Sequence, residues 1–318
     1  MLRGSGMRVR HAGYAPHVAL FMVQVMFGTW PIFGKIALRA LPPAALVAFR
    51  VSGGAIAFLI LQKIMGRVRI VNRRDYARLL LYSMLGVVLN QFLFVKGLSY
   101  TTVINATLLG TTIPIFTLLV CLFLGLDSIS LRRIFGIILA AAGVIYLVDP
   151  MRADFSANNT LGNILIVANS LSYGAYIAIS KDMLKRYGAL TVITWIFIFG
   201  SFMTLPIGAW SIAESSSIQS AGPLIWLVVL YIILVPTVGA YYLNAWALAR
   251  VAPSTVAVYI YLQPLLAFIL APLVLNEPLN SRTWIAALLI FAGVAIVSSR
   301  SRSVALEEVA EHPDALGH

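Results

Sequence analysis

Polar and aromatic side chains recur at helical spacing within segments of this chain that are otherwise apolar. Gln24, Gly28 and Pro31 would share one face of a helix near the N-terminus. Amides, hydroxyls and aromatic rings that meet inside a membrane protein can bind the polar and apolar parts of a small organic solute. For a single Asn or Gln, a hydrogen bond between helices remains an equally good interpretation.

As a set, these side chains favour a cavity that binds a small-molecule substrate, because they come from both halves of the chain. The predicted lining consists of amides, aromatic rings and one deep cation: Trp30, Arg50, Asn90, Asn105, Asn169, Tyr173, Tyr176, Tyr241, Asn244, Tyr259 and Gln263. Such a lining suits a neutral or zwitterionic solute of amino-acid size. A multivalent anion would require several cations, and a bulky cation would require a buried carboxylate.

Arg50 is the deepest charge in this set. It lies about seven residues inside its predicted helix, or roughly 10 Å at 1.5 Å per residue. A cation at that depth is costly unless it is paired or hydrated, which makes Arg50 a functional candidate. The alternative is an arginine that extends outward or binds carbonyls at a helix end. Lys35 and Lys96 lie nearer the predicted boundaries, so we expect them to extend outward.

Residues for catalysis or metal binding are not evident. The Asp and Glu residues fall in loops, at helix ends or in the C-terminal tail, Cys121 is the only cysteine, and the four histidines lie near the termini. We therefore predict no cofactor and no metal site, and no buried acid for proton or sodium coupling. The sequence also lacks a phosphate loop, so a membrane-embedded enzyme is a weak alternative. A non-transporting scaffold or receptor is the other, but it would be expected to carry a large extramembrane domain.

The elements that position these residues follow from composition. Hydrophobic residues make up 60% of the chain, charged residues 11%, and the mean hydropathy is +0.92. So much apolar surface predicts an all-α integral membrane protein with the lipid bilayer as its partner. The net charge of +12 is carried in short segments between apolar runs. Cations placed there orient helices, so we predict no nucleic acid binding.

Ten apolar stretches are long enough to cross a bilayer, and they predict ten transmembrane helices. The stretches are 17–38, 43–62, 77–98, 102–124, 131–149, 161–181, 190–210, 223–248, 253–275 and 282–300. A polar segment, 150–160, separates the two halves, and a polar acidic tail, 301–318, is predicted to be disordered. The first stretch is too long for a signal peptide and lacks a convincing cleavage site, which indicates a retained helix.

The distribution of Lys and Arg predicts the orientation. With a cytoplasmic N-terminus, seventeen fall in inner segments and three in outer loops. This bias predicts a multi-pass protein of the plasma or inner cell membrane with both termini in the cytoplasm.

The second half of the chain repeats markers of the first at an offset of 150 residues. The matched positions are Pro114 and Pro264, Asp127 and Glu277, and Gly143 and Gly293. Each repeat, 17–149 and 161–300, contains five predicted helices. An odd number means that the second repeat enters the membrane from the opposite side, so the repeats are inverted, as in many secondary transporters.

The matched prolines and the small residues around Gly143 carry further predictions. Pro114 and Pro264 are expected to be gating or kink points, with helix packing as the alternative. The small residues Gly136, Ala140 and Gly143 indicate close helix packing. That packing can lie within one protomer or between two, which leaves a homodimer open.

The order and spacing of these features resemble the EamA-type members of the drug/metabolite transporter superfamily over residues 17–300. The residues that carry the resemblance are Trp30 with Lys35, Pro43, Arg50, Pro114, the segment 127–144, Glu277-Pro278-Leu279 and Ala292-Gly293-Val294. One departure is Asp127, where such families usually have Glu. The resemblance implies a secondary transporter that exports amino acids or related metabolites by alternating access around a central cavity.

Overall fold

The computed structural model describes residues 14–66, 70, 72–125, 130–148, 158–215, 218, 221–251, 256, 259–260 and 262–298. Throughout these residues the regular structure is helical and contains no strand, so the predicted all-α class is confirmed. Asp127, the start of the polar segment 150–160 and the tail 301–318 lie outside the described residues.

Seven of the described helical spans are long and apolar enough to cross a membrane. They are α1 (Ala15–Ala37), α2 (Pro43–Met65), α3 with η1 and α4 (Arg73–Tyr100), α5 with α6 (Val103–Phe123), α8 (Asn158–Tyr187), α9 (Ala189–Ala213), and α10 with η3 and α11 (Pro223–Leu248). Three shorter helices are α7 (Leu131–Val148), α13 (Leu262–Leu275) and α14 (Ser281–Ser298), each with an apolar stretch. All ten overlap the ranges predicted from the sequence.

The ends of several helices follow from their local sequence. Pro43 and Pro223 occupy first turns, where a missing N–H costs nothing. The side chain of Asn72 accepts a hydrogen bond from the Arg74 N–H at the start of α3 (Arg73–Ser83). Helix α8 begins at Asn158, inside the segment that we predicted as a polar break up to residue 160. Amide side chains are favourable at helix starts, so polarity there marked the beginning of a helix.

Pro114 and Pro264 occupy the first turns of their helices. Helix α5 (Val103–Gly110) ends before Thr111, and Pro114 follows in the first turn of α6 (Ile113–Phe123). Pro264 is the third residue of α13. A proline there needs no N–H partner, so each marks a helix start, and gating remains a prediction.

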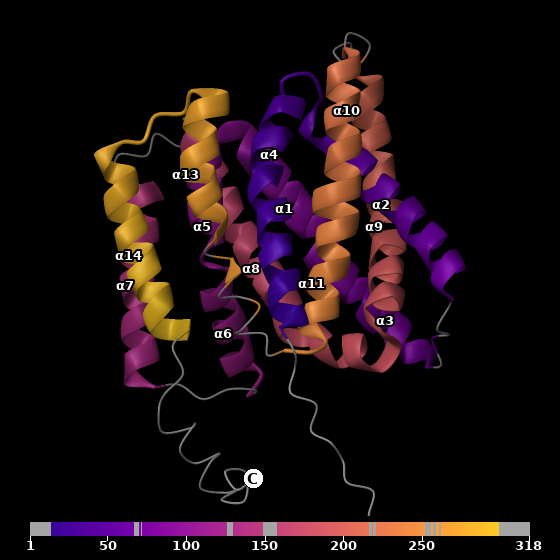
Figure 1. Ribbon diagram of the computed structural model, residues 1–318, viewed down its shortest axis with the longest axis horizontal. Helices are drawn as coiled ribbons and strands as arrows, with labels where there is room; N and C mark the ends of the chain where they lie inside the picture. The colour runs from indigo at the N-terminus through magenta and orange to yellow at the C-terminus, as the bar shows by residue number, and fades with distance from the viewer. Residues whose placement is uncertain are drawn as a thin grey trace, which may run out of the picture.

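The helices form a central group flanked by packed pairs (Figure 1). Helix α1 contacts α11 (Ala240–Leu248) and α13, while α4 (Asn90–Tyr100) packs along α8. On either side of this group, α2 packs against α9 and α7 against α14. Helix α1 begins and α14 ends on the lower side of the view.

The small residues of α7 meet those of α14 within the chain. A Cβ atom on Gly293 would lie 2.4 Å from the Ala140 nitrogen and 2.5 Å from the Gly136 oxygen. No larger residue fits there without separating the helices. The small-residue stripe is therefore explained by packing inside one protomer.

Two π-helical segments interrupt α-helical spans at the repeat offset. They are η1 (Met84–Leu89) and η3 (Ile233–Gly239), whose last residues, Leu89 and Gly239, are 150 residues apart. Each is followed directly by a helix that carries candidate site residues, α4 after η1 and α11 after η3. Such π-segments occur frequently at functional sites.

Candidate solute-binding site

A pocket of about 70 Å³ lies among the central helices. Six elements contribute most of its wall: α1, α2, α4, α5, α8 and α11. Its lining is Phe27, Trp30, Pro31, Arg50, Asn90, Gln91, Phe94, Ala106, Thr107, Gly110, Ile113, Asn169, Tyr173, Tyr241 and Gln263. Seven predicted residues meet here: Trp30, Arg50, Asn90, Asn169, Tyr173, Tyr241 and Gln263. Pockets for drug-sized ligands reach about 300 Å³ or more, so in this conformation only a very small solute fits.

Arg50 is held in the wall of this pocket by side chains. It is 2% exposed, and its Nε donates to Thr237 Oγ1 at 2.6 Å while its Nη1 donates to Gln91 Oε1 at 2.6 Å. The contact from Nη2 to the Pro236 carbonyl is long, at 3.5 Å. Its guanidinium carbon lies 3.8 Å from the centre of the Trp30 ring. Arg50 therefore neither extends outward nor relies on helix-end carbonyls.

The partners of Arg50 are all uncharged. Among the described residues, no carboxylate lies within ion-pair distance of its guanidinium. Hydrogen bonds and the Trp30 ring orient the cation without neutralising it. A buried positive charge that borders a cavity favours an anionic group in that cavity.

A hydrogen-bond network links Arg50 to both halves of the chain. Gln91 donates from Nε2 to the Tyr241 hydroxyl at 2.6 Å, and that hydroxyl donates to Asn90 Oδ1 at 3.1 Å. Asn169 donates to the Asn90 carbonyl at 2.7 Å. Gln91 and Tyr241 are 150 residues apart, so positions matched by the repeat offset touch each other beside the pocket. A satisfied network of this kind fixes the direction of its polar groups.

Tyr176 and Asn244 stand behind the pocket wall. Asn244 donates to the Tyr173 hydroxyl at 3.2 Å, and the rings of Tyr173 and Tyr176 are 5.7 Å apart. Both side chains are buried. They support Tyr173 without being part of the lining.

Asn105 and Tyr259 are not brought to the pocket. On α5 the lining face is formed by Ala106, Thr107 and Gly110, and helical periodicity turns Asn105 away from it. The Tyr259 hydroxyl hydrogen-bonds with His17 Nδ1 at 2.9 Å. In this conformation neither residue is part of the lining, and a role for them in the path of the solute stays a prediction.

Some lining residues were not among the predicted candidates. Gln91 adjoins Asn90 and is a polar residue in the same apolar stretch, so the sequence could have predicted it. Thr237 is not part of the lining but binds Arg50, and it lies in an apolar run where one hydroxyl carries no signal. Gly110 leaves space: a Cβ atom added there would meet nothing within 4 Å.

Lys35 and Lys181 bind carbonyls where helical spans end. Lys35 Nζ donates to the carbonyls of Leu98 and Thr101 at 2.7 and 2.6 Å. Lys181 Nζ donates to the carbonyl of Val251 at 3.0 Å. Thr101 and Val251 are again 150 residues apart. A cation at the C-terminal end of a helix satisfies its free carbonyls, so these lysines have structural roles.

Glu277 binds the start of α5, which lies just after the Lys35-bound carbonyl of Thr101 in the chain. Its two carboxylate oxygens accept hydrogen bonds from the N–H groups of Val103 and Ile104 at 2.9 and 3.1 Å. A carboxylate at a helix N-terminus stabilises the helix through these N–H groups and its dipole.

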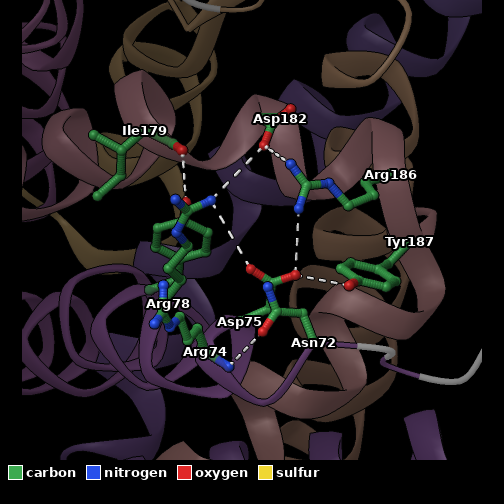
Figure 2. A network of polar contacts seen from close by, with 9 residues as sticks. Asn72, Arg74, Asp75, Arg78, Ile179, Asp182, Arg186 and Tyr187 are labelled. Carbon is green, nitrogen blue, oxygen red and sulfur yellow. Dashed lines mark hydrogen bonds and ion pairs between the residues drawn. The ribbon is translucent and has the colours of Figure 1, made fainter.

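A charged cluster joins α3 to the end of α8 (Figure 2). Asp75 is 2% exposed and accepts hydrogen bonds from the Tyr187 hydroxyl at 2.7 Å and from Arg186 at 3.3 Å. Arg186 also contacts Asp182 at 2.9 Å. Arg78 lies 3.9 Å from Asp75 and 4.0 Å from Asp182, so two cations face two carboxylates in this cluster, in contrast to Arg50. Within the described residues, no group of His, Cys, Asp and Glu could hold a metal ion.

Comparison of the sequence with known protein families indicates a transporter. The model of the EamA-like transporter family matches residues 16–148 and again residues 160–299. The chain belongs to this family. It is a multi-pass membrane protein with a transporter role, and the suspected membership in the drug/metabolite transporter superfamily is confirmed.

Relatives occur in archaea, bacteria and plants. An uncharacterized transporter of Archaeoglobus fulgidus is 26% identical over 89% of this chain and 97% of the relative. The uncharacterized transporter YetK of Bacillus subtilis is 25% identical over 88% of this chain and 86% of the relative. WALLS ARE THIN 1 of Arabidopsis thaliana is 26% identical over 72% and 68% of the two chains. A solved crystal structure shares the fold with a TM-score of 0.64 at 17% identity, covering 89% and 96%.

Proposed function

We propose that this protein is a secondary transporter that exports a small amino-acid-like metabolite, with the carboxylate of the solute bound by Arg50. The observation that carries the proposal is a buried guanidinium that borders a pocket and is surrounded by neutral partners. One cation suits one carboxylate. The amides of Asn90 and Asn169 suit the polar remainder of the solute, and the rings of Trp30 and Tyr173 suit its apolar part.

Alternating access is the mechanism that the arrangement supports. The pocket is lined by residues from both matched stretches of the chain, from Phe27 to Ile113 and from Asn169 to Gln263. An offset of 150 residues separates the ends of the two π-segments, Gln91 from Tyr241, and the lysine-bound carbonyl of Thr101 from that of Val251. Two near-equivalent halves can exchange conformations and open a shared pocket to one side at a time. The small volume of the pocket implies that it widens when the solute enters.

The remaining proposals concern topology. We propose ten transmembrane helices in two inverted repeats, 17–149 and 161–300, within the plasma or inner cell membrane. Both termini, including the tail 301–318, are assigned to the cytoplasm because Lys and Arg concentrate in the segments on that side. Pro114 and Pro264 are assigned as hinge points between the two states. A homodimer, nucleic acid binding or catalysis is not needed for this function.

Transport in purified form tests the proposal. The protein is reconstituted into liposomes loaded with a mixture of amino acids and their carboxamides, and release is followed by mass spectrometry. We expect release of a narrow set of carboxylate-bearing solutes, and loss of that release in Arg50→Ala. Release of the carboxamides at the same rate, in wild type and variant alike, would refute the role of Arg50. An Arg50→Ala protein that stays monodisperse and thermally stable shows that the loss is not due to unfolding.

A further inference from the structure

A second cavity, separate from the pocket around Arg50, lies where α2 and α8 end and α9 begins. Its volume is about 580 Å³, and it shares no lining residue with the first pocket. The wall residues with polar or aromatic groups are Lys185, Tyr187, Thr191, Tyr242, Trp246 and Arg250.

The charged side chains of this lining are both cations, Lys185 and Arg250. The Arg250 guanidinium lies 4.0 Å from the centre of the Trp246 ring, and its Nη1 donates to the Trp246 carbonyl at 2.8 Å. Over the described parts of the chain, neither cation has a carboxylate within 4 Å. The lining of this cavity therefore carries positive charge and contains no carboxylate.

Arg186, the cation next to Lys185 in the sequence, is paired with carboxylates. Arg186 is bound to Asp75 and Asp182 and is turned into the charged cluster drawn in Figure 2. Lys185, one residue earlier, lines the cavity and is exposed. Because the carboxylates nearby are occupied by Arg186, the charge of Lys185 remains available for a ligand.

The position of the cavity points to a lipid. It lies at the ends of membrane spans, beside Met65, which is 62% exposed, and next to the amphipathic ring of Trp246. The distribution of Lys and Arg assigns these span ends to the cytoplasmic leaflet, where anionic lipids concentrate. The first N–H groups of α9, which have no partner inside the helix, border the same cavity and favour an anion.

We propose that this cavity binds the phosphate group of an anionic phospholipid through Lys185 and Arg250. The ring of Trp246 holds the guanidinium in place, and the apolar rim leaves the acyl chains in the bilayer. This site does not depend on the identity of the transported solute.

Lipid binding to the delipidated full-length protein tests the proposal. Affinities for phosphatidylglycerol and phosphatidylcholine are compared by native mass spectrometry and by thermal stabilisation in detergent. One basic residue near a membrane surface contributes about a fivefold gain in affinity for anionic lipid. Wild type should therefore prefer phosphatidylglycerol by about 25-fold, and the double variant K185Q/R250Q should lose this preference.

Matched variants separate the site from general charge effects. Lys63→Gln removes a cation from the last turn of α2 outside the cavity lining and should keep the preference. The charge-conserving variant K185R should also keep it, which controls for folding. No preference in wild type, or an equal loss in Lys63→Gln, would overturn the proposal. Inorganic phosphate stabilising the protein as strongly as phosphatidylglycerol would overturn the assignment to a lipid.

Discussion

Arg50 and Lys35 are two cations within membrane-spanning helices, and their surroundings differ. Lys35 binds the carbonyls of Leu98 and Thr101, which end a helical span and have no helical partner. Arg50 is buried at 2% exposure and binds Gln91 and Thr237, beside the pocket. The lysine satisfies acceptors that the fold leaves free, whereas the arginine remains a net positive charge.

This difference separates a structural charge from one available to a ligand. A lysine at a helix end matches the partial negative charge of the free carbonyls, so its local charge is largely compensated. Neutral side chains around a guanidinium provide acceptors without providing a negative charge. Mutations at the two positions should therefore affect different properties.

Arg50→Ala should have the largest effect on transport. A hydrogen bond to a charged group contributes about 1.5–3 kcal/mol, so losing the contact with a solute carboxylate should lower transport efficiency by about 10- to 100-fold. Initial rates in proteoliposomes measure this. Arg50→Lys keeps the charge and should recover part of the rate. Unchanged transport in Arg50→Ala would place the solute elsewhere.

Filling the pocket by a substitution at Gly110 should have the next largest effect on transport. A Cβ atom there meets nothing within 4 Å, so a larger side chain can occupy the space of the solute without displacing the helix. Gly110→Leu should lower transport by about tenfold while the melting temperature stays close to that of wild type. An equally active Gly110→Leu protein would argue against this pocket as the path of the solute.

Lys35→Met should reduce stability more than transport. It leaves two carbonyls at the end of α4 without their cation, which should cost about 1–2 kcal/mol because the side chain is only partly buried. Thermal unfolding in detergent measures this loss. If transport falls as far as in Arg50→Ala while stability is unchanged, the structural assignment of Lys35 is wrong.

Tyr173→Phe should have the smallest effect of the four. It removes the hydrogen bond to Asn244 and keeps the ring, which corresponds to about 1 kcal/mol, or about fivefold in affinity. Competition binding with the transported solute measures the change. Tyr259→Phe, outside the pocket lining, is the matched control and should bind as wild type does.

The sequence predicted where the described helices lie, because apolar length and helical period are local properties. Predicting the lining from sequence was harder, since it depends on rotation about each helix. In α5, a rotation of one residue exchanges Asn105 for Ala106 and Thr107. Asn244 and Tyr176 contact Tyr173 but do not line the pocket, because their depth behind the wall depends on packing between helices. The role of Thr237 became visible only with the fold, because its partner Arg50 is 187 residues away.

The dependence of recognition on the solute carboxylate tests the role of Arg50 most directly. Inhibition of transport by an amino acid and by its carboxamide is measured in proteoliposomes for wild type and for Arg50→Gln, which keeps hydrogen-bonding capacity and removes the charge. We predict that wild type prefers the carboxylate by about tenfold or more, and that Arg50→Gln binds both compounds alike. A preference for the carboxylate that persists undiminished in Arg50→Gln would contradict the assignment of Arg50 as its partner.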